Sequence, residues 1–127
     1  MKDGKAELYF ESAEFNRING LLALKDGLYV ADFGNGSNYK ISTDKKLTKV
    51  AVTSQGADGV VLVGKNEYLV SSWHGEIYHV NAKGESRKVL DTKDQKISAA
   101  DIEYNSKTKT VYVPTFFANC IMAYELK

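Results

Sequence analysis

Residues 18–33 read INGLLALKDGLYVADF, and this segment returns twice along the chain. The second copy, at residues 57–73, reads ADGVVLVGKNEYLVSSW. The third and more divergent copy, at residues 100–116, reads ADIEYNSKTKTVYVPTF. In each copy two short strand-forming runs flank a polar turn, which is the pattern of a β-hairpin. The chain is therefore built from a repeated β unit.

The period of the repeat indicates how these units are arranged. Its polar markers, Asn19, Asp58 and Asp101, lie 39 and 43 residues apart. β-Propeller blades repeat at about 40–50 residues, and each blade is a meander of four antiparallel strands. Glycines interrupt the chain often, and no stretch keeps a helical period of 3.6 residues. We expect an all-β fold of about three four-stranded antiparallel blades, which is half of a six-bladed ring.

The strands can be placed from the turns between them. Blade one, residues 18–53, is expected to contain strands at 21–24, 28–33, 38–43 and 47–52, and blade two, residues 57–92, strands at 60–63, 68–73, 76–80 and 86–90. Blade three, residues 99–127, lacks an outer strand of its own after the strand at 120–126. Within it, Pro114 has no N–H for the sheet, which predicts a bulge or an early strand end. Residues 92–98 leave room for one helical turn.

The N-terminal residues resemble an outer strand. Residues 4–10, GKAELYF, match residues 84–90, GESRKVL, at the outer edge of blade two. Residues 1–12 are therefore expected to be the outer strand of a preceding blade or of a partner's blade. Three blades do not close a ring, because propellers have about four to eight. Two alternatives remain open: the chain is the C-terminal half of a longer protein, or two copies form a homodimer that completes a six-bladed ring.

Composition excludes several function classes. The 17 basic and 16 acidic residues nearly cancel and form no basic stripe, so no nucleic-acid partner is expected. No apolar run approaches the length of a membrane span, so no membrane partner is expected either. Cys120 is the single cysteine, which rules out an internal disulfide framework. It is expected to be a small buried strand residue rather than a reactive thiol. The compartment stays open.

The three markers should meet on one face of the propeller. Asn19, Asp58 and Asp101 open the innermost strands, which surround the central axis. Amide and carboxylate oxygens suit Ca²⁺ or Mg²⁺, or Zn²⁺ with water completing its shell, so a divalent cation is a candidate cofactor. The alternative is turn chemistry, because Asn and Asp before Gly often bond their own backbone.

Aromatic residues are expected to surround this polar centre. Phe33, Trp73 and Phe116 close the second strands at matching positions, and His74 follows in an adjacent loop. A polar centre with an aromatic rim is typical of a small-molecule site, so these four residues and Asp101 are the candidate substrate-binding residues. The alternatives are that the three aromatic rings pack between blades and that His74 is an exposed turn residue.

At these residues the chain resembles the senescence-marker-protein/gluconolactonase (regucalcin-like) family of six-bladed propellers, with the NHL-repeat propellers as second choice. The resemblance is carried by ING at 18–20, LYVAD at 28–32, ADGV at 57–60 and GEIYHV at 75–80. It implies a divalent cation held by Asn19 and Asp58, with Asp58 also helping to deprotonate the attacking water. The implied activity is metal-dependent lactone hydrolysis by a protein of which this chain is the C-terminal half, inactive alone. An NHL-like alternative is a non-catalytic propeller that binds a small ligand or a protein partner on its loop face.

Overall fold

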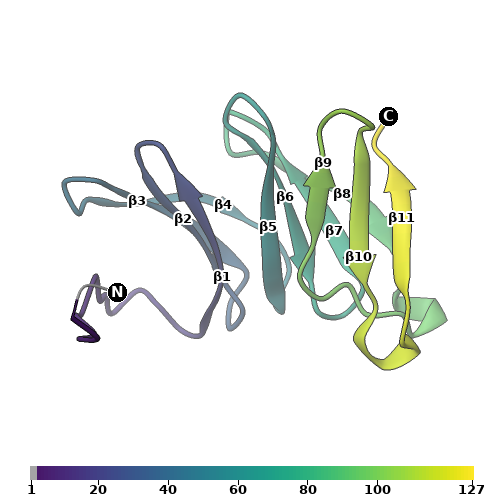
Figure 1. Ribbon diagram of the computed structural model, residues 1–127, viewed down its shortest axis with the longest axis horizontal. Helices are drawn as coiled ribbons and strands as arrows, with labels where there is room; N and C mark the ends of the chain where they lie inside the picture. The colour runs from purple at the N-terminus through teal and green to yellow at the C-terminus, as the bar shows by residue number, and fades with distance from the viewer. Residues whose placement is uncertain (1–2) are drawn as a thin grey trace.

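A computed structural model describes residues 3–127, which form three antiparallel sheets. The first sheet contains β1 (Ile18–Leu24), β2 (Gly27–Asp32), β3 (Ser37–Ser42) and β4 (Leu47–Val52). The second contains β5 (Ala57–Gly64), β6 (Glu67–Ser72), β7 (Glu76–Val80) and β8 (Ser86–Asp91). The third contains β9 (Glu103–Asn105), β10 (Thr110–Pro114) and β11 (Ile121–Glu125), and the two short 3₁₀ helices are η1 (Lys93–Gln95) and η2 (Phe116–Ala118). Figure 1 shows the three sheets in chain order.

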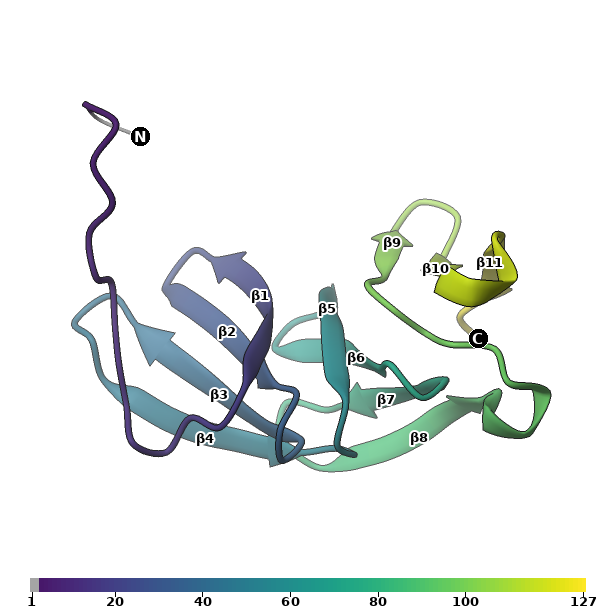
Figure 2. The ribbon, with the colours of Figure 1, turned by 90° about the horizontal axis from the view of Figure 1, so that it is seen from below.

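Each sheet is a meander in which consecutive strands are neighbours, and the order in the four-stranded sheets is β1-β2-β3-β4 and β5-β6-β7-β8. Seen from below, the three sheets are arranged side by side as an arc, with β1, β5 and β9 at the inner ends (Figure 2). This is the arrangement of propeller blades, and the expected all-β fold is confirmed. Among residues 3–127, no helix is long and apolar enough to cross a membrane.

The core lies between the blades. Tyr29 and Ala31 of β2 face the second blade and pack against Val60 and Val70, while Tyr29 and Tyr68 lie 4.3 Å apart between ring centroids. A second cluster joins blades two and three through residues such as Leu69, with the full buried set Val61, Leu69, Ile77, Ala99, Ile102, Val111 and Val113. Side chains of one strand alternate between the two faces of a blade, so the middle blade is buried on both.

Two glycines set how closely the innermost strands approach. A Cβ added to Gly20 in β1 would collide with the carbonyl oxygen of Asp58, and one added to Gly59 in β5 would collide with Asp101 and the backbone of Ile102. The residue after each of the first two markers is therefore glycine because the next marker's backbone occupies that space. This contact brings the start of each inner strand against the start of the next.

Pro114 ends β10 early, as one of the two sequence alternatives predicted, and no bulge is needed. The pairing of β10 with β11 is regular from Thr110 to Pro114. The carbonyl of Pro114 accepts from Ala100, and β9 pairs only with Thr110–Tyr112, so the side of the backbone where an N–H is missing faces no strand. The chain then turns into η2 instead of continuing to Phe116.

The N-terminal segment differs from the expectation of a strand. Residues 5–12 carry no strand pairing within this chain. Phe10 and Phe15 instead pack on the outward flank of blade one, against a cluster that contains Tyr39 and Ile41. The flank of blade one offers no strand edge with which residues 5–12 could pair as an outer strand. Their pairing with a preceding or partner blade therefore stays a prediction.

Candidate functional site

The start of each innermost strand carries one marker residue. Asn19 lies in β1, Asp58 in β5, and Asp101 two residues before β9. Because close contacts are made at Gly20 and Gly59, the structure brings the three markers together along the inside of the arc, where the innermost strands begin. Asn19 and Asp101 are exposed and Asp58 is half-buried. We call these three residues the axial site.

The electrostatics of the axial site depend on Asp58. Burial raises the pKa of its carboxyl above the usual value, and the negative charge of Asp101 raises it further, while the Asn19 side chain lowers it through hydrogen bonding. Ionised Asp58 is thus held in an environment that disfavours its charge. A cation between Asp58 and Asp101 would relieve this repulsion.

The axial site offers the type of ligand atom, oxygen, that a hard cation prefers. One amide oxygen and two carboxylates are the ligand types that Ca²⁺ and Mg²⁺ prefer. Three oxygen-bearing side chains are fewer than these cations coordinate, and no group of three or more His, Cys, Asp or Glu side chains that could hold a metal ion is found within residues 3–127. Water or groups from other blades would have to supply the remaining ligands.

The aromatic candidates are only partly assembled. Trp73 lies against Phe116 with ring centroids 4.6 Å apart, and Phe117 completes this group at 4.8 Å from Phe116. We call Trp73, Phe116 and Phe117 the aromatic cluster. Phe33 lies apart from it, with the guanidinium of Arg17 placed 5.6 Å from its ring centroid. The structure therefore joins two of the three predicted aromatics and adds one that sequence reasoning missed.

Exposure distinguishes the aromatic cluster from core packing. Phe116 and Phe117 are 56% and 72% exposed, whereas Trp73 is half-buried. Phe116 also has a φ of 53°, a left-handed backbone conformation that is unusual for a bulky residue. The η2 turn thus presents large rings to solvent at some cost in local strain.

His74 and Cys120 lie in turns. His74 is exposed between β6 and β7, and its ring lies over Gly56 at the junction of blades one and two. Cys120 is exposed, so the expectation that it is buried in a strand was wrong. It lies just before β11, where its backbone pairs with Thr115, and its side chain faces the hydroxyl of Thr115 at 3.3 Å.

A buried carboxylate beside the site was missed by sequence reasoning. Asp32, at the end of β2, is fully buried and accepts hydrogen bonds from the backbone N–H groups of Asn16 (2.7 Å), Arg17 (3.0 Å) and Gly34 (2.8 Å). Burial acts to raise the pKa of Asp32, but these bonds outweigh it and hold the pKa below its usual value. Asp32 therefore fixes the segment that leads into Asn19. The matching residue one repeat later is Ser72, whose hydroxyl donates to the carbonyl of Gln55 at 2.9 Å, so the repeat gave no signal of a buried carboxylate here.

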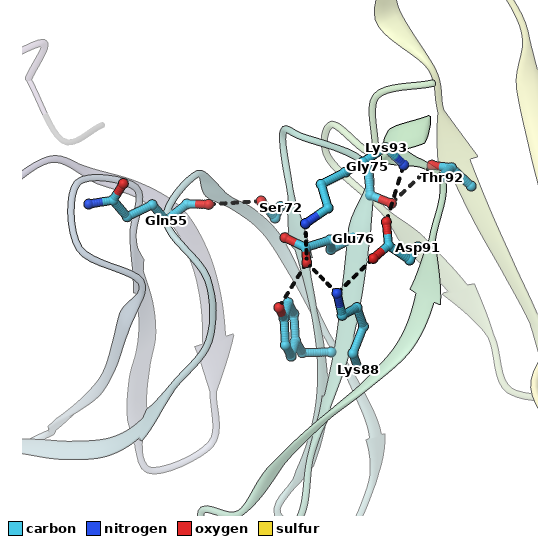
Figure 3. Close-up of polar contacts among 9 residues, drawn as sticks. Gln55, Ser72, Gly75, Glu76, Lys88, Asp91, Thr92 and Lys93 are labelled. Atoms are coloured by element: carbon cyan, nitrogen blue, oxygen red, sulfur yellow. Dashed lines mark hydrogen bonds and ion pairs between the residues drawn. The ribbon is translucent and has the colours of Figure 1, made fainter. Parts of the chain in front are cut away.

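A second buried carboxylate, Glu76, holds an ionic network at the start of β7 (Figure 3). It lies 2.8 Å from the ammonium of Lys88 and 2.9 Å from that of Lys93, and it accepts from the hydroxyl of Tyr78 at 3.1 Å. Burial acts to raise its pKa, but these partners outweigh burial and lower the pKa to about 2. Lys88 is shared with Asp91, so the network ties β7 to β8 and η1. We assign it a structural role.

The fold and the axial site define the class of protein: an all-β chain of propeller blades with polar residues where the inner strands begin. A likeness to solved structures agrees. A catalytically inactive variant of virginiamycin B lyase from Staphylococcus aureus, solved with quinupristin and itself a propeller enzyme, matches with a TM-score of 0.59 at 14% identity. The match covers 98% of this chain and 46% of that one, so the chain spans about half of that protein.

A computationally designed protein, Ika4, matches with a TM-score of 0.51 at 9% identity, over 98% of this chain and 99% of the design. At these identities the likenesses show the fold alone. No protein-family model matches the sequence. No curated protein matches it either.

Proposed function

We propose that the axial site binds a divalent cation and that the complete propeller is a metal-dependent hydrolase that opens a small-molecule lactone. The observation that carries the proposal is the meeting of Asn19, Asp58 and Asp101, where the pKa of Asp58 is raised by burial and by its acidic neighbour. Oxygen ligands with unfavourable mutual charge are what a cation stabilises. The resemblance of residues 18–20 and 57–60 to gluconolactonase-like propellers supports the same assignment.

The roles of the residues follow from their chemistry. Asn19, Asp58 and Asp101 would hold the cation. A bound cation would polarise a lactone carbonyl and lower the pKa of a water molecule. Asp58 would also accept the proton of that water, the role that the resemblance implies for it. The aromatic cluster, on the same end of the blades, supplies apolar surface for a ring-shaped substrate.

Calorimetric titration tests the cation site. The chelator-treated chain is titrated with Ca²⁺, Mg²⁺ and Zn²⁺, and we expect one of them to bind. Asp58→Asn should weaken that binding by about tenfold or more, since one charged ligand corresponds to at least 1.4 kcal/mol. Asp26→Asn is the matched control, because Asp26 is an exposed acid that pairs with Lys40. If none of the three cations binds the wild-type chain, the cation site is refuted.

A lactonase assay separates the catalytic proposal from the binding one. Cation-dependent hydrolysis of glucono-δ-lactone that is lost in Asp58→Asn would support the hydrolase. Cation binding without turnover would refute catalysis by this chain alone. The same result for a complete six-bladed assembly would favour the second candidate, a non-catalytic propeller that binds its ligand on the loop face. The exposed aromatic cluster favours that candidate. Trp73 is the single tryptophan, so its fluorescence reports ligand binding there directly.

A further inference from the structure

The two ends of the arc expose residues that are buried inside it. Tyr29 in blade one and Leu69 in blade two occupy matching positions in the repeat, and each is at most 1% exposed because the following blade covers it. Tyr112 occupies this position in blade three and is 38% exposed. The flank of blade three is thus built to contact another blade.

The opposite flank shows the complementary pattern. Val60, two residues after the marker of blade two, is 5% exposed because it packs on blade one. Leu21 occupies the same place in blade one and is 60% exposed. Phe10 and Phe15 cover the outer part of this flank but leave its inner part, at β1, open. Each end of the arc therefore presents the half of a blade–blade contact that the other end lacks.

The N-terminal segment lies where the outer strand of a preceding blade would lie. Inside the chain, the turn between β7 and β8 contacts the outer strand of blade one, with Gly84 against the carbonyl of Val50. The turn between β3 and β4 contacts the N-terminal segment in the same way. There the ammonium of Lys45 donates to the carbonyl of Tyr9 at 3.2 Å and lies over its ring. Residues 5–10 thus lie beside blade one in the way that β4 lies beside blade two.

Blade three offers the matching edge. The N–H of Leu126 donates to the carbonyl of Lys109, and the carbonyl of Cys120 accepts from the N–H of Thr115. The backbone groups of the even-numbered residues of β11 therefore face β10. The backbone groups of Ile121, Ala123 and Glu125 therefore point away from the sheet. Among residues 3–127 no strand pairs with this edge. An apolar open edge of this kind is a template for another strand.

We propose that two copies of this chain close into one ring, in which residues 5–10 of each copy form the fourth strand of the other copy's third blade. The flank around Tyr112 then packs on the flank around Leu21, and the two-fold symmetry makes the contact twice. Three blades per copy give six in the ring, which lies within the range of closed propellers. Closure places Asp101 of each copy beside Asn19 of the other. The proposal does not depend on the hydrolase assignment.

Light scattering on the 127-residue chain tests closure through its mass in solution. We expect the mass to rise to that of two chains with concentration and not beyond it. Ala123→Pro removes an outward-facing N–H of β11, so it should weaken dimerisation by about tenfold or more, with blades one and two still folded by circular dichroism. Lys49→Pro is the matched control. Lys49 faces outward on β4, an edge that stays in solvent after closure, so this variant should remain a dimer.

Hydrogen exchange gives a second measurement that needs no variant. The N–H groups of Ile121, Ala123 and Glu125 should be protected in the concentrated wild-type chain and exchange faster on dilution. A wild-type chain that keeps the mass of one copy at every concentration would overturn the proposal. A mass that rises beyond two copies would overturn it as well, because it would show open-ended assembly. Protection of the β11 edge in samples that have the mass of one copy would also refute pairing between copies.

Discussion

Asp32 and Asp58 are aspartates in adjacent blades, and the structure gives them opposite electrostatic environments. Asp32 is surrounded by backbone N–H donors, which stabilise its ionised form. Asp58 loses solvent and faces Asp101, which destabilises its ionised form. Asp32 is therefore a structural anchor, whereas Asp58 has the character of a functional group. The difference comes from the direction of nearby dipoles and charges and not from burial alone.

Replacing Asp32 should destabilise the fold. Asp32→Ala leaves the N–H groups of Asn16, Arg17 and Gly34 without their buried acceptor, and we expect a loss of about 3 kcal/mol in the free energy of unfolding. Urea denaturation measures it. Asp26→Ala, which breaks an exposed pair with Lys40, should cost less than about 1 kcal/mol. Equal losses in the two variants would contradict the anchoring role.

At the scale of elements, the positions of β1 and β5 depend on two residues without a side chain. Gly20 and Gly59 leave room for the neighbouring strand. The outer strands also carry an irregularity that repeats from blade one to blade two. The β3–β4 pairing shifts register at Asn38 and Tyr39, and the β7–β8 pairing shifts between Ile77 and Tyr78, one repeat later. Such bulges bend an outer strand and increase its twist. Blades one and two therefore share the same bend at their outer strands.

Filling the glycine contact should separate blades two and three. In Gly59→Ala the new Cβ overlaps Asp101 and the backbone N of Ile102, so we expect a loss of about 2 kcal/mol or more in the free energy of unfolding. Gly64→Ala is the matched control in the same strand, because its Cβ would meet only the Glu67 side chain at ordinary contact distances. Thermal and urea denaturation of both variants check the result. A stable Gly59→Ala would show that the inner strands are free to move apart.

Much of the element scale could be predicted from the sequence, and the reasons are physical. Strand positions followed from alternating apolar runs and turns, and β4 and β7 have the bounds that were predicted. The meeting of Asn19, Asp58 and Asp101 followed from meander topology. Side-chain contacts between residues far apart in the sequence could not be predicted. Glu76 finds Lys93 only through η1, and Phe117 joins Trp73 only because Phe116 adopts a left-handed turn.

For the whole molecule, the buried carboxylates determine how stability depends on pH. Asp32 and Glu76 have lowered pKa values in the folded chain, that of Glu76 at about 2. Their stabilisation is present above the unfolded values of about 3.9 and 4.3 and is lost as the pH falls through the folded ones. Asp58 acts in the opposite direction, since its raised pKa costs stability at neutral pH and that cost disappears in acid. The lowering of the Glu76 pKa is the large shift and that of Asp32 adds to it, so acid should destabilise the protein.

We therefore expect the melting temperature to fall between about pH 5 and pH 2. Glu76→Gln should lower it at pH 7 and flatten this dependence, because the titrating group is gone. Glu11→Gln, in the exposed N-terminal segment, should leave both the melting temperature and its slope unchanged. Differential scanning calorimetry over this pH range measures both quantities. A Glu76→Gln slope as steep as that of the wild type would contradict the assignment.

The glycine contacts also limit how this molecule could change over evolutionary time. Close contacts at Gly20 and Gly59, mostly with the neighbouring backbone, fix the spacing of the innermost strands. The contact at Gly20 is made by the carbonyl of Asp58, so the side chains at positions 19 and 58 take no part in it. Selection can thus exchange the chemistry at the centre of such a ring while its diameter stays constant.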